Sequence, residues 1–336
     1  MVAVGVIGSG AWGTTLALSL ARKGIATTLW EHMPVRAEQM QQRRENVLFL
    51  PGFVFPEMLQ VTASIAEAVQ HKDLVLLVTP SQRLRENLHL LAPYLGQDTI
   101  LVSASKGIET GSLKRMTEVI AEELPETTER IAALSGPNLS REVAEEQPAA
   151  AVVAAHEHGV AVKVRTILST TTFRVYTSLD VVGVELGGAL KNVIAIACGI
   201  GDGMGYGENA KAAITTRGLA EISRLGMAAG ANPLTFLGLA GIGDLIATCA
   251  SPLSRNQQLG RRLAAGEKLQ DILHSTRTVA EGVTTTRAAL QLDARYQVEM
   301  PITQQLSLVL FEGLDPHKAL AELMLRHPKG ELEGIR

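Results

Sequence analysis

Short apolar runs alternate with helical patterns along the first half of the chain. Runs rich in apolar and β-branched residues predict strands at 2–7, 26–30, 74–78, 99–103, 131–134, 150–154 and 173–176. Between them, apolar residues recur at helical spacing, as in 11–23 and 84–91. This alternation is typical of a mostly parallel sheet with helices on both faces. Residues 1–180 are therefore predicted to form an α/β domain.

The pattern changes near residue 180, after which no segment reads as a strand. Helical runs separated by Gly, Pro and Asn fill the rest, and the predicted helices are 181–200, 208–229, 239–248, 256–265, 281–296, 302–312 and 316–325. Residues 181–336 are therefore predicted to form a second, all-α domain. The apolar run 181–200 contains Glu185 and Lys191, which favours a buried helix over a membrane span.

Composition narrows the class of protein. The 336 residues carry a formal net charge of -3, so no basic excess indicates a nucleic acid or an anionic membrane as partner. The two cysteines, Cys198 and Cys249, lie in different segments, which predicts neither a disulfide framework nor a metal site. They fit a reducing cytosol. No basic stretch or cleavage site flanks the first strand, so we expect no targeting segment and a cytoplasmic location.

A glycine-rich turn directly follows the first strand and opens a helix. Its pattern is Gly8-Ser9-Gly10-Ala11-Trp12-Gly13. In this context the first glycine permits a tight turn, the second lets the backbone approach a pyrophosphate, and the third allows helix and strand to pack closely. Free N–H groups at the start of the helix attract phosphate. The motif predicts a Rossmann-type unit that binds a nicotinamide dinucleotide, and hence an oxidoreductase.

The choice between NAD(H) and NADP(H) stays open. Glu31 lies 18 residues after Gly13 at the end of the second strand, where a carboxylate accepts hydrogen bonds from a ribose 2′-OH and favours NAD(H). His32 and the nearby Arg36 could instead receive the 2′-phosphate of NADP(H). Both residues could also be solvated groups at a strand end. We expect both cofactors to be accepted.

Two loops after predicted strands carry polar residues. Lys106 follows one strand, at the sheet edge where ligands sit in such folds, and is a candidate anion contact. Gly136, Asn138 and Ser140 follow another, where a Gly-Pro turn exposes backbone N–H groups. A solvated lysine and an ordinary capped turn are the alternatives.

The apolar helix 181–200 contains a lysine. A buried amine is costly unless it is partnered or deprotonated, so Lys191 is a candidate catalytic residue, with Asn192 beside it. A structural ion pair is the alternative. Asp244 lies among glycines and aliphatic residues, which suggests a buried carboxylate with a lysine partner.

A third segment, Ser254-Arg255-Asn256, precedes a predicted helix. Ser254 is typical of an N-cap, and an arginine and an amide at a helix start form an anion site, because arginine binds phosphate bidentately. Capping alone would account for Ser254 but not for the other two residues.

Together these segments resemble the bacterial NAD(P)-dependent glycerol-3-phosphate dehydrogenases. The matching segments run in order from the N-terminus to Glu281 and comprise 8–13, 106–107, 135–137, 173–176, 184–194, 241–244 and 251–256. The resemblance implies an all-α C-terminal domain like that of 6-phosphogluconate dehydrogenase. It also implies reversible reduction of dihydroxyacetone phosphate to sn-glycerol 3-phosphate, for glycerophospholipid synthesis.

The resemblance also implies roles for individual residues. Lys191 matches the catalytic proton acceptor, with Asp244 and Lys106 beside it. Positions that match substrate contacts are Lys106, Gly136, Asn138, Lys191, Asn192, Asp244, Ser254, Arg255 and Asn256. Positions that match the dinucleotide site are Gly8, Gly10, Ala11, Trp12, Gly13, Glu31, His32, Lys106, Ser140, Arg255, Val279 and Glu281. Ala11, Asn138 and Ser140 depart from the residues that are frequent in the family but keep their size class.

Two other functions compete with this one. A different two-domain β-hydroxyacid-type dehydrogenase, acting for example on a sugar acid, would share the plan, but the segment 254–256 favours a phosphomonoester. A non-catalytic dinucleotide sensor would have no use for Lys191 with Asp244. The helical domain could also support a homodimer, although no patch for it is evident.

Overall fold

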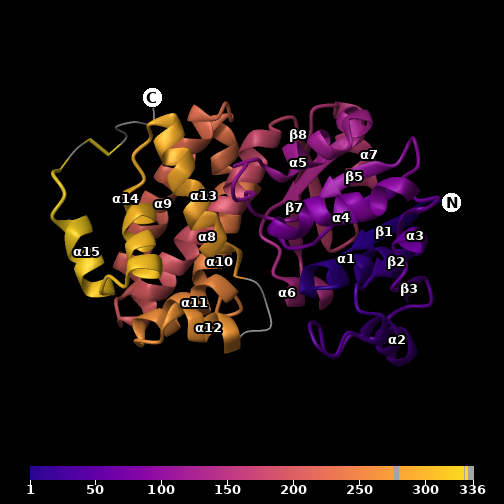
Figure 1. The fold of residues 1–336 in the computed structure, drawn as a ribbon, viewed down its shortest axis with the longest axis horizontal. Coiled ribbons are helices and arrows are strands. Elements are labelled where there is room, and N and C mark those ends of the chain that lie inside the picture. The colour runs from indigo at the N-terminus through magenta and orange to yellow at the C-terminus, as the bar shows by residue number, and fades with distance from the viewer. Residues whose placement is uncertain (276–279, 329, 332–336) are drawn as a thin grey trace. The chain divides into compact units, whose positions relative to one another are not determined.

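The protein is described here by a computed structural model that places residues 1–275, 280–328, 330 and 331. Val279, one of the expected cofactor residues, lies outside the described residues. The chain divides into two compact units (Figure 1). The sheet unit comprises 1–105 and 116–181, and the helical unit comprises 106–115 and the described part of 182–336.

The sheet unit is built on eight strands in the order β3-β2-β1-β4-β5-β6-β7-β8. All neighbouring strands are parallel except β6 and β7, which are antiparallel. The strands are β1 (Ala3–Ile7), β2 (Ala26–Trp30), β3 (Leu59–Thr62), β4 (Leu74–Leu77), β5 (Ile100–Ser103), β6 (Ile131–Ser135), β7 (Ala149–Ala155) and β8 (Phe173–Ser178). The α/β, mostly parallel fold class predicted from the sequence is confirmed; the short strand β3 was missed.

Helices cover both faces of this sheet, and the α-helices of the unit are α1 (Ala11–Arg22), α2 (Pro34–Arg43), α3 (Ile65–Val69), α4 (Leu84–Leu91), α5 (Met116–Glu123), α6 (Ser140–Ala144) and α7 (His158–Leu168). Successive side chains of a strand point to opposite faces, so each strand supplies two cores. In β4, Leu74 and Leu76 join the core beneath α1 and α7, whereas Val75 and Leu77 join the core beneath α3, α4 and α5. Burial on both faces explains why the strands are almost wholly apolar.

The helical unit contains no strand among the residues that the structure places. Its α-helices are α8 (Val181–Gly203), α9 (Glu208–Ala228), α10 (Asp244–Ala250), α11 (Arg255–Ala264), α12 (Leu269–Ser275), α13 (Glu281–Tyr296), α14 (Pro301–Ser307) and α15 (Pro316–Met324). The predicted all-α character is confirmed. Two of the expected helices are divided: short π-helical turns, η5 (Leu239–Gly243) and η6 (Leu308–Glu312), adjoin α10 and α14.

Helix α8 forms the centre of this unit. It is the one described helix long and apolar enough to cross a membrane, yet 89% of its most apolar window is buried inside the protein. Small residues let other backbones approach it: a Cβ on Gly187 would lie 2.4 Å from the carbonyl oxygen of Ala240, and one on Gly199 would lie 2.1 Å from that of Gln257. These close approaches bring the segments that begin α10 and α11 against α8.

The segment 106–115 belongs to the helical unit, although it follows strand β5 of the sheet unit. A β-bridge joins Ile108 to Arg115, and Ile108 is fully buried in the core that surrounds α8. Arg115 also donates to the carboxylate of Glu185 on α8, at 2.6 Å. This packing carries Lys106 into the helical unit.

Candidate active site

The helical unit brings together two lysines and one carboxylate. Asp244, which is 1% exposed, accepts a hydrogen bond from Nζ of Lys191 through Oδ1, and one from Nζ of Lys106 at 2.8 Å through Oδ2. Lys191 is itself buried and also donates to Oγ1 of Thr248, at 2.6 Å. With both amines protonated, the cluster carries one positive charge in excess, which suits an anion or a developing oxyanion.

The three groups come from segments distant in the sequence. Lys191 lies on α8, Asp244 begins α10, and Lys106 begins the segment 106–115. Gly241 makes the connection to α10 possible: its backbone is non-helical, and a Cβ there would lie 2.1 Å from the carbonyl oxygen of Phe236. The glycine-rich stretch around residue 241 therefore folds tightly enough to present Asp244 to both lysines.

Burial makes Lys106 readily titratable. Desolvation lowers the pKa of its amine to about 7, and the charge of Lys191 acts in the same direction, whereas the contact with Asp244 opposes the shift. The group can therefore be charged or neutral near neutral pH.

Thr248 is a member of this cluster that sequence reasoning did not single out. Its Oγ1 donates to the backbone oxygen of Asp244 at 2.7 Å, which leaves the hydroxyl oxygen facing Lys191. Asp244 and Thr248 are four residues apart on α10 and therefore lie on the same face of the helix. This four-residue spacing is the sequence signal that could have identified Thr248 as a partner of Asp244.

Asparagines hold the neighbouring segments together. Nδ2 of Asn256 donates to Oδ1 of Asn192 at 2.9 Å, and Nδ2 of Asn192 reaches the backbone oxygen of Lys106 at 3.4 Å. Oδ1 of Asn256 accepts from the backbone N–H of Gly282 at 3.2 Å. Asn192 and Asn256 are both buried, so they link α8, α11, α13 and the Lys106 segment.

The start of α11 combines a cap with a cation. Ser254 is the N-cap, and its hydroxyl accepts from the backbone N–H of Gln257 at 3.3 Å. Arg255, the first helical residue, is exposed, and the nearby charge of Glu281 acts on it electrostatically. A cation beside free N–H groups at the start of a ten-residue helix is suited to bind a phosphate.

In the sheet unit, the glycine motif forms a turn with space above it. Gly8 has φ of +116°, and a Cβ on Gly13 would lie 1.9 Å from the carbonyl oxygen of Gly8, so the protein itself needs both glycines. A Cβ on Gly10 would meet no described atom within 4 Å. The open face at Gly10 therefore leaves room for a ligand close to the backbone, as a dinucleotide requires.

Side chains around this turn are also compatible with a dinucleotide bound there. Asn46, which sequence reasoning missed, is buried and donates to the backbone oxygen of Ser9 and to Oγ1 of Thr14, each at 2.8 Å. Trp12 packs edge-on against Phe173, with ring centroids 6.2 Å apart. The buried indole Nε1 of Trp12 has no hydrogen-bond partner among the described residues.

The carboxylate of Glu31 is fully buried and already bonded. It accepts from Oγ of Ser9, from the backbone N–H of Met33 at 2.9 Å and from Nε of Arg36 at 2.7 Å. Nδ1 of His32 lies 3.0 Å from it. The residues expected to favour NAD(H) and NADP(H) are thus paired with each other beside the glycine turn.

The loop after β6 also belongs to the sheet unit. Gly136 has φ of +131°, and a Cβ there would lie 2.9 Å from the Cα of Ala151. The side chain of Asn138 is partly buried. Ser140 begins α6, and its backbone oxygen accepts from Oγ1 of Thr15 at 3.0 Å, which ties the loop to α1.

Comparison with known proteins decides the family. The model of the NAD-dependent glycerol-3-phosphate dehydrogenase N-terminus matches residues 3–161, and that of the C-terminus matches residues 180–321. The chain belongs to the NAD-dependent glycerol-3-phosphate dehydrogenase family. The resemblance noted from the sequence is therefore confirmed.

Individual members of the family are similar over their full length. A glycerol-3-phosphate dehydrogenase (NAD(P)+) of Syntrophotalea carbinolica is 52% identical over 331 residues, which cover 98% of this chain and 99% of that protein. The corresponding enzyme of Streptomyces griseus is 48% identical over 330 residues, 98% of each. The crystal structure of glycerol-3-phosphate dehydrogenase from Coxiella burnetii superimposes with a TM-score of 0.92 at 36% identity, covering 96% of this chain and 99% of that one.

Proposed function

We propose that the protein is an NAD(P)-dependent glycerol-3-phosphate dehydrogenase that reversibly reduces dihydroxyacetone phosphate to sn-glycerol 3-phosphate. The observation that carries this proposal is the buried carboxylate of Asp244 shared by Lys191 and Lys106, in a chain of this family. When bound, the nicotinamide supplies the hydride that reduces the carbonyl carbon.

Lys191 supplies the proton. As negative charge develops on the carbonyl oxygen, the ammonium of Lys191 donates a proton to it, and in the reverse direction the neutral amine accepts the hydroxyl proton. Asp244 and Thr248 orient this amine, because both hydrogen-bond to it. Lys106, which shares the carboxylate of Asp244 with Lys191, adds positive charge beside the developing oxyanion.

The substrate's phosphate is assigned to the start of α11. There, Arg255 offers a planar fork of N–H donors, and Ser254 has a hydroxyl beside it. Asn256 contributes to this substrate site by holding Asn192 in place, because its Nδ2 donates to Oδ1 of Asn192. Gly136 and Asn138 are proposed as further substrate contacts from the loop after β6.

The dinucleotide is assigned to the glycine turn of the sheet unit. Gly8, Gly10 and Gly13 would hold the pyrophosphate, with Ala11 and Trp12 at the start of α1 and Ser140 at the start of α6. Lys106, Arg255 and Glu281 of the helical unit, with Val279 outside the described residues, complete the set implied by the family. Glu31, His32 and Arg36 would meet the adenosine ribose.

The pairing of Glu31 with Arg36 supports the acceptance of both cofactors. NAD(H) presents a 2′-OH that a carboxylate can accept from, and NADP(H) presents a phosphate that Arg36 can bind. We expect kcat/KM for NADH and NADPH to differ by less than about a thousandfold, or about 4 kcal/mol. A larger preference for either one would contradict this dual role.

One assay tests the activity against its alternatives. Purified protein is mixed with NADH or NADPH, and loss of absorbance at the reduced-nicotinamide band is followed on addition of dihydroxyacetone phosphate, a sugar acid, or neither. Turnover with dihydroxyacetone phosphate alone supports the proposal. Turnover only with the sugar acid would favour another β-hydroxyacid-type dehydrogenase, and binding without any turnover would favour a sensor.

A cytoplasmic location and a homodimer are part of the same proposal. Both described cysteines, Cys198 and Cys249, are free and buried, as a reducing compartment allows. Cell fractionation and light scattering of the purified protein test the two points separately.

A further inference from the structure

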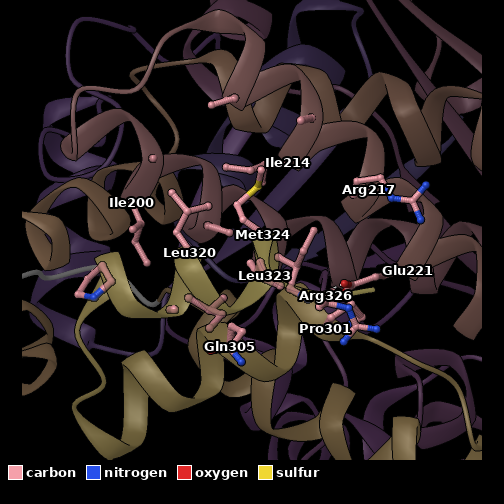
Figure 2. Close-up of a pocket in the computed structure, with 18 of the residues that line it drawn as sticks. Ile200, Ile214, Arg217, Glu221, Pro301, Gln305, Leu320, Leu323, Met324 and Arg326 are labelled. Carbon is pink, nitrogen blue, oxygen red and sulfur yellow. Dashed lines mark hydrogen bonds between the residues drawn. The ribbon is translucent and has the colours of Figure 1, made fainter. Parts of the chain in front are cut away.

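The helical unit contains a hollow that the proposed reaction does not use. It has a volume of about 520 Å³ and is lined by residues of α8, α9, α14, η6 and α15 (Figure 2). This volume lies within the usual range of small-molecule sites, about 300–1,000 Å³. No lining residue belongs to the cluster of Lys191, Asp244, Lys106 and Thr248.

Most of the lining is aliphatic. Ile200 comes from α8, Ile214 from α9, and Leu320, Leu323 and Met324 come from α15. Figure 2 shows Ile200 and Leu320 on the side opposite Arg217. A surface of this kind favours an alkyl chain, because removing methylene groups from water is favourable.

Charge gathers on the other side of the hollow. Figure 2 shows Arg217, Glu221 and Arg326 on the side away from Ile200. Arg224 also lines this side. Arg326 pairs with the carboxylate of Glu299 at 3.3 Å, so Arg217 and Arg224 are the cations that can face an anionic head group.

The carboxylate of Glu221 is already committed to the protein. It is 1% exposed and accepts from the backbone N–H of Ile302 at 2.6 Å and from the backbone N–H and Oγ1 of Thr303, so it caps α14. Burial raises the pKa of Glu221 to about 7. It therefore balances the arginines only in part near neutral pH.

Arg224 has donor capacity left over. This side chain is 8% exposed, and its Nε and Nη2 donate to the backbone oxygen of Glu299 at 3.3 and 3.0 Å. Its Nη1 is buried and has no hydrogen-bond partner among the described residues. A buried guanidinium N–H without an acceptor is costly, which points to an anionic ligand at this end of the hollow.

We propose that this hollow binds a single-chain amphiphile with a carboxylate head group, such as a fatty acid. The alkyl chain lies against Ile200, Ile214 and Leu320, and the carboxylate faces Arg217 and Arg224.

The first test is calorimetric titration of the purified protein with dodecanoate below its micellar concentration. We expect saturable binding of one molecule per chain. Dodecanol and dodecyltrimethylammonium, which keep the chain but lose or invert the charge, should bind at least about tenfold more weakly. Acetate, which lacks the alkyl chain, should show no saturation.

Variants locate the ligand. Ala213 lines the hollow from an exposed position of α9, whereas its neighbour Ala212 is equally exposed and does not line it. Ala213→Trp should weaken dodecanoate binding at least about tenfold, and Ala212→Trp should leave it unchanged. Arg217→Gln should weaken it about three- to tenfold, and Arg295→Gln, the same change outside the hollow, should not.

Dehydrogenase activity of each variant shows whether the helical unit is intact. Equal binding of dodecanol and dodecanoate, or undiminished binding to folded Ala213→Trp, would overturn the proposal. A second result would also overturn it: the wild-type protein is a dimer that binds no dodecanoate, and Ala213→Trp is a monomer by light scattering. A second copy of the chain would then occupy this surface.

Discussion

The candidate site of the sheet unit is formed mainly by backbone groups, whereas that of the helical unit is formed by side chains. In the sheet unit the site is a backbone turn: Gly8 and Gly13 shape it, Gly10 leaves it open, and Asn46 fixes it through a backbone oxygen. In the helical unit the site is a set of charged side chains. Asp244 holds Lys191 and Lys106 across sequence separations of 53 and 138 residues.

The two kinds of site should tolerate different substitutions. A site made of backbone is sensitive to added atoms, because any Cβ that fills its open face competes with the ligand. A site made of side chains is sensitive to removal or to altered charge, because a group left behind loses its partner in a buried place. The predictions below separate these two kinds of sensitivity.

The largest effect is expected from removing the proton donor. Lys191→Ala should lower kcat for dihydroxyacetone phosphate by about two to four orders of magnitude, the range of general acid–base groups. Dinucleotide affinity should barely change, because the glycine turn is untouched. Steady-state kinetics and fluorescence titration with NADH measure the two quantities on one preparation.

Lys268→Ala, the same substitution at an exposed position of the helical unit, is the control and should leave both values unchanged. A folded Lys191→Ala enzyme that keeps more than about a tenth of wild-type kcat would remove this residue from the mechanism.

The backbone site was more predictable from the sequence than the side-chain site. The glycine motif is local: a strand, a turn and a helix within 20 residues specify it. The grouping of Lys106 with Asp244 is not local. Lys106 follows β5 in the chain and was expected to belong to the first domain. It belongs instead to the helical unit, because Ile108, two residues later, is buried in the core of that unit. Only tertiary packing reveals that step.

The second-largest effect concerns the phosphate site at the start of α11. Arg255→Lys keeps the charge but loses the planar fork, so kcat/KM for dihydroxyacetone phosphate should fall by about 1.5–3 kcal/mol, the scale of a hydrogen bond to a charged group. The decrease should appear mainly in KM. Arg295→Lys, at an exposed position of α13, serves as the control. Unchanged kinetics in folded Arg255→Lys would place the phosphate elsewhere.

The third prediction adds an atom to the backbone site. Gly10→Ala introduces a methyl group that meets no described protein atom within 4 Å, so thermal stability should be preserved. Dinucleotide affinity should fall about tenfold or more, or about 1.4 kcal/mol, because the methyl occupies the open face. The readouts are Tm and NADH titration.

Gly159→Ala is a matched control in the same unit, since a Cβ there also meets no described atom. It should change neither quantity. Full NADH affinity in Gly10→Ala would mean that the pyrophosphate does not approach this turn.

Other residues escaped sequence reasoning for recognisable physical reasons. The strand Leu59–Thr62 is only four residues long, too short for an alternating pattern to stand out. Asn46 and Thr248 are polar residues whose importance comes from hydrogen bonds to groups distant in the sequence, Ser9 and Thr14 for the first and Lys191 for the second. Glu31 was expected at the cofactor's ribose, and its burial against Ser9 and Arg36 depends on side-chain packing that no local pattern encodes.

The smallest expected effect is a change in the pH profile of the side-chain site. Burial lowers the pKa of Lys106 to about 7, and a lysine is charged only below its pKa. The positive charge that attracts the substrate is therefore present below pH 7 and is lost as pH rises. Since kcat/KM reports the free enzyme, it should fall about fivefold between pH 7 and pH 8. Lys106→Arg stays charged throughout and should abolish this decline, whereas Lys163→Arg, at an exposed position of α7, should retain it. The Gly10→Ala variant should keep the wild-type profile, because its defect is steric. A decline that persists unchanged in Lys106→Arg would assign the titration to another group and remove the charge of Lys106 from substrate capture.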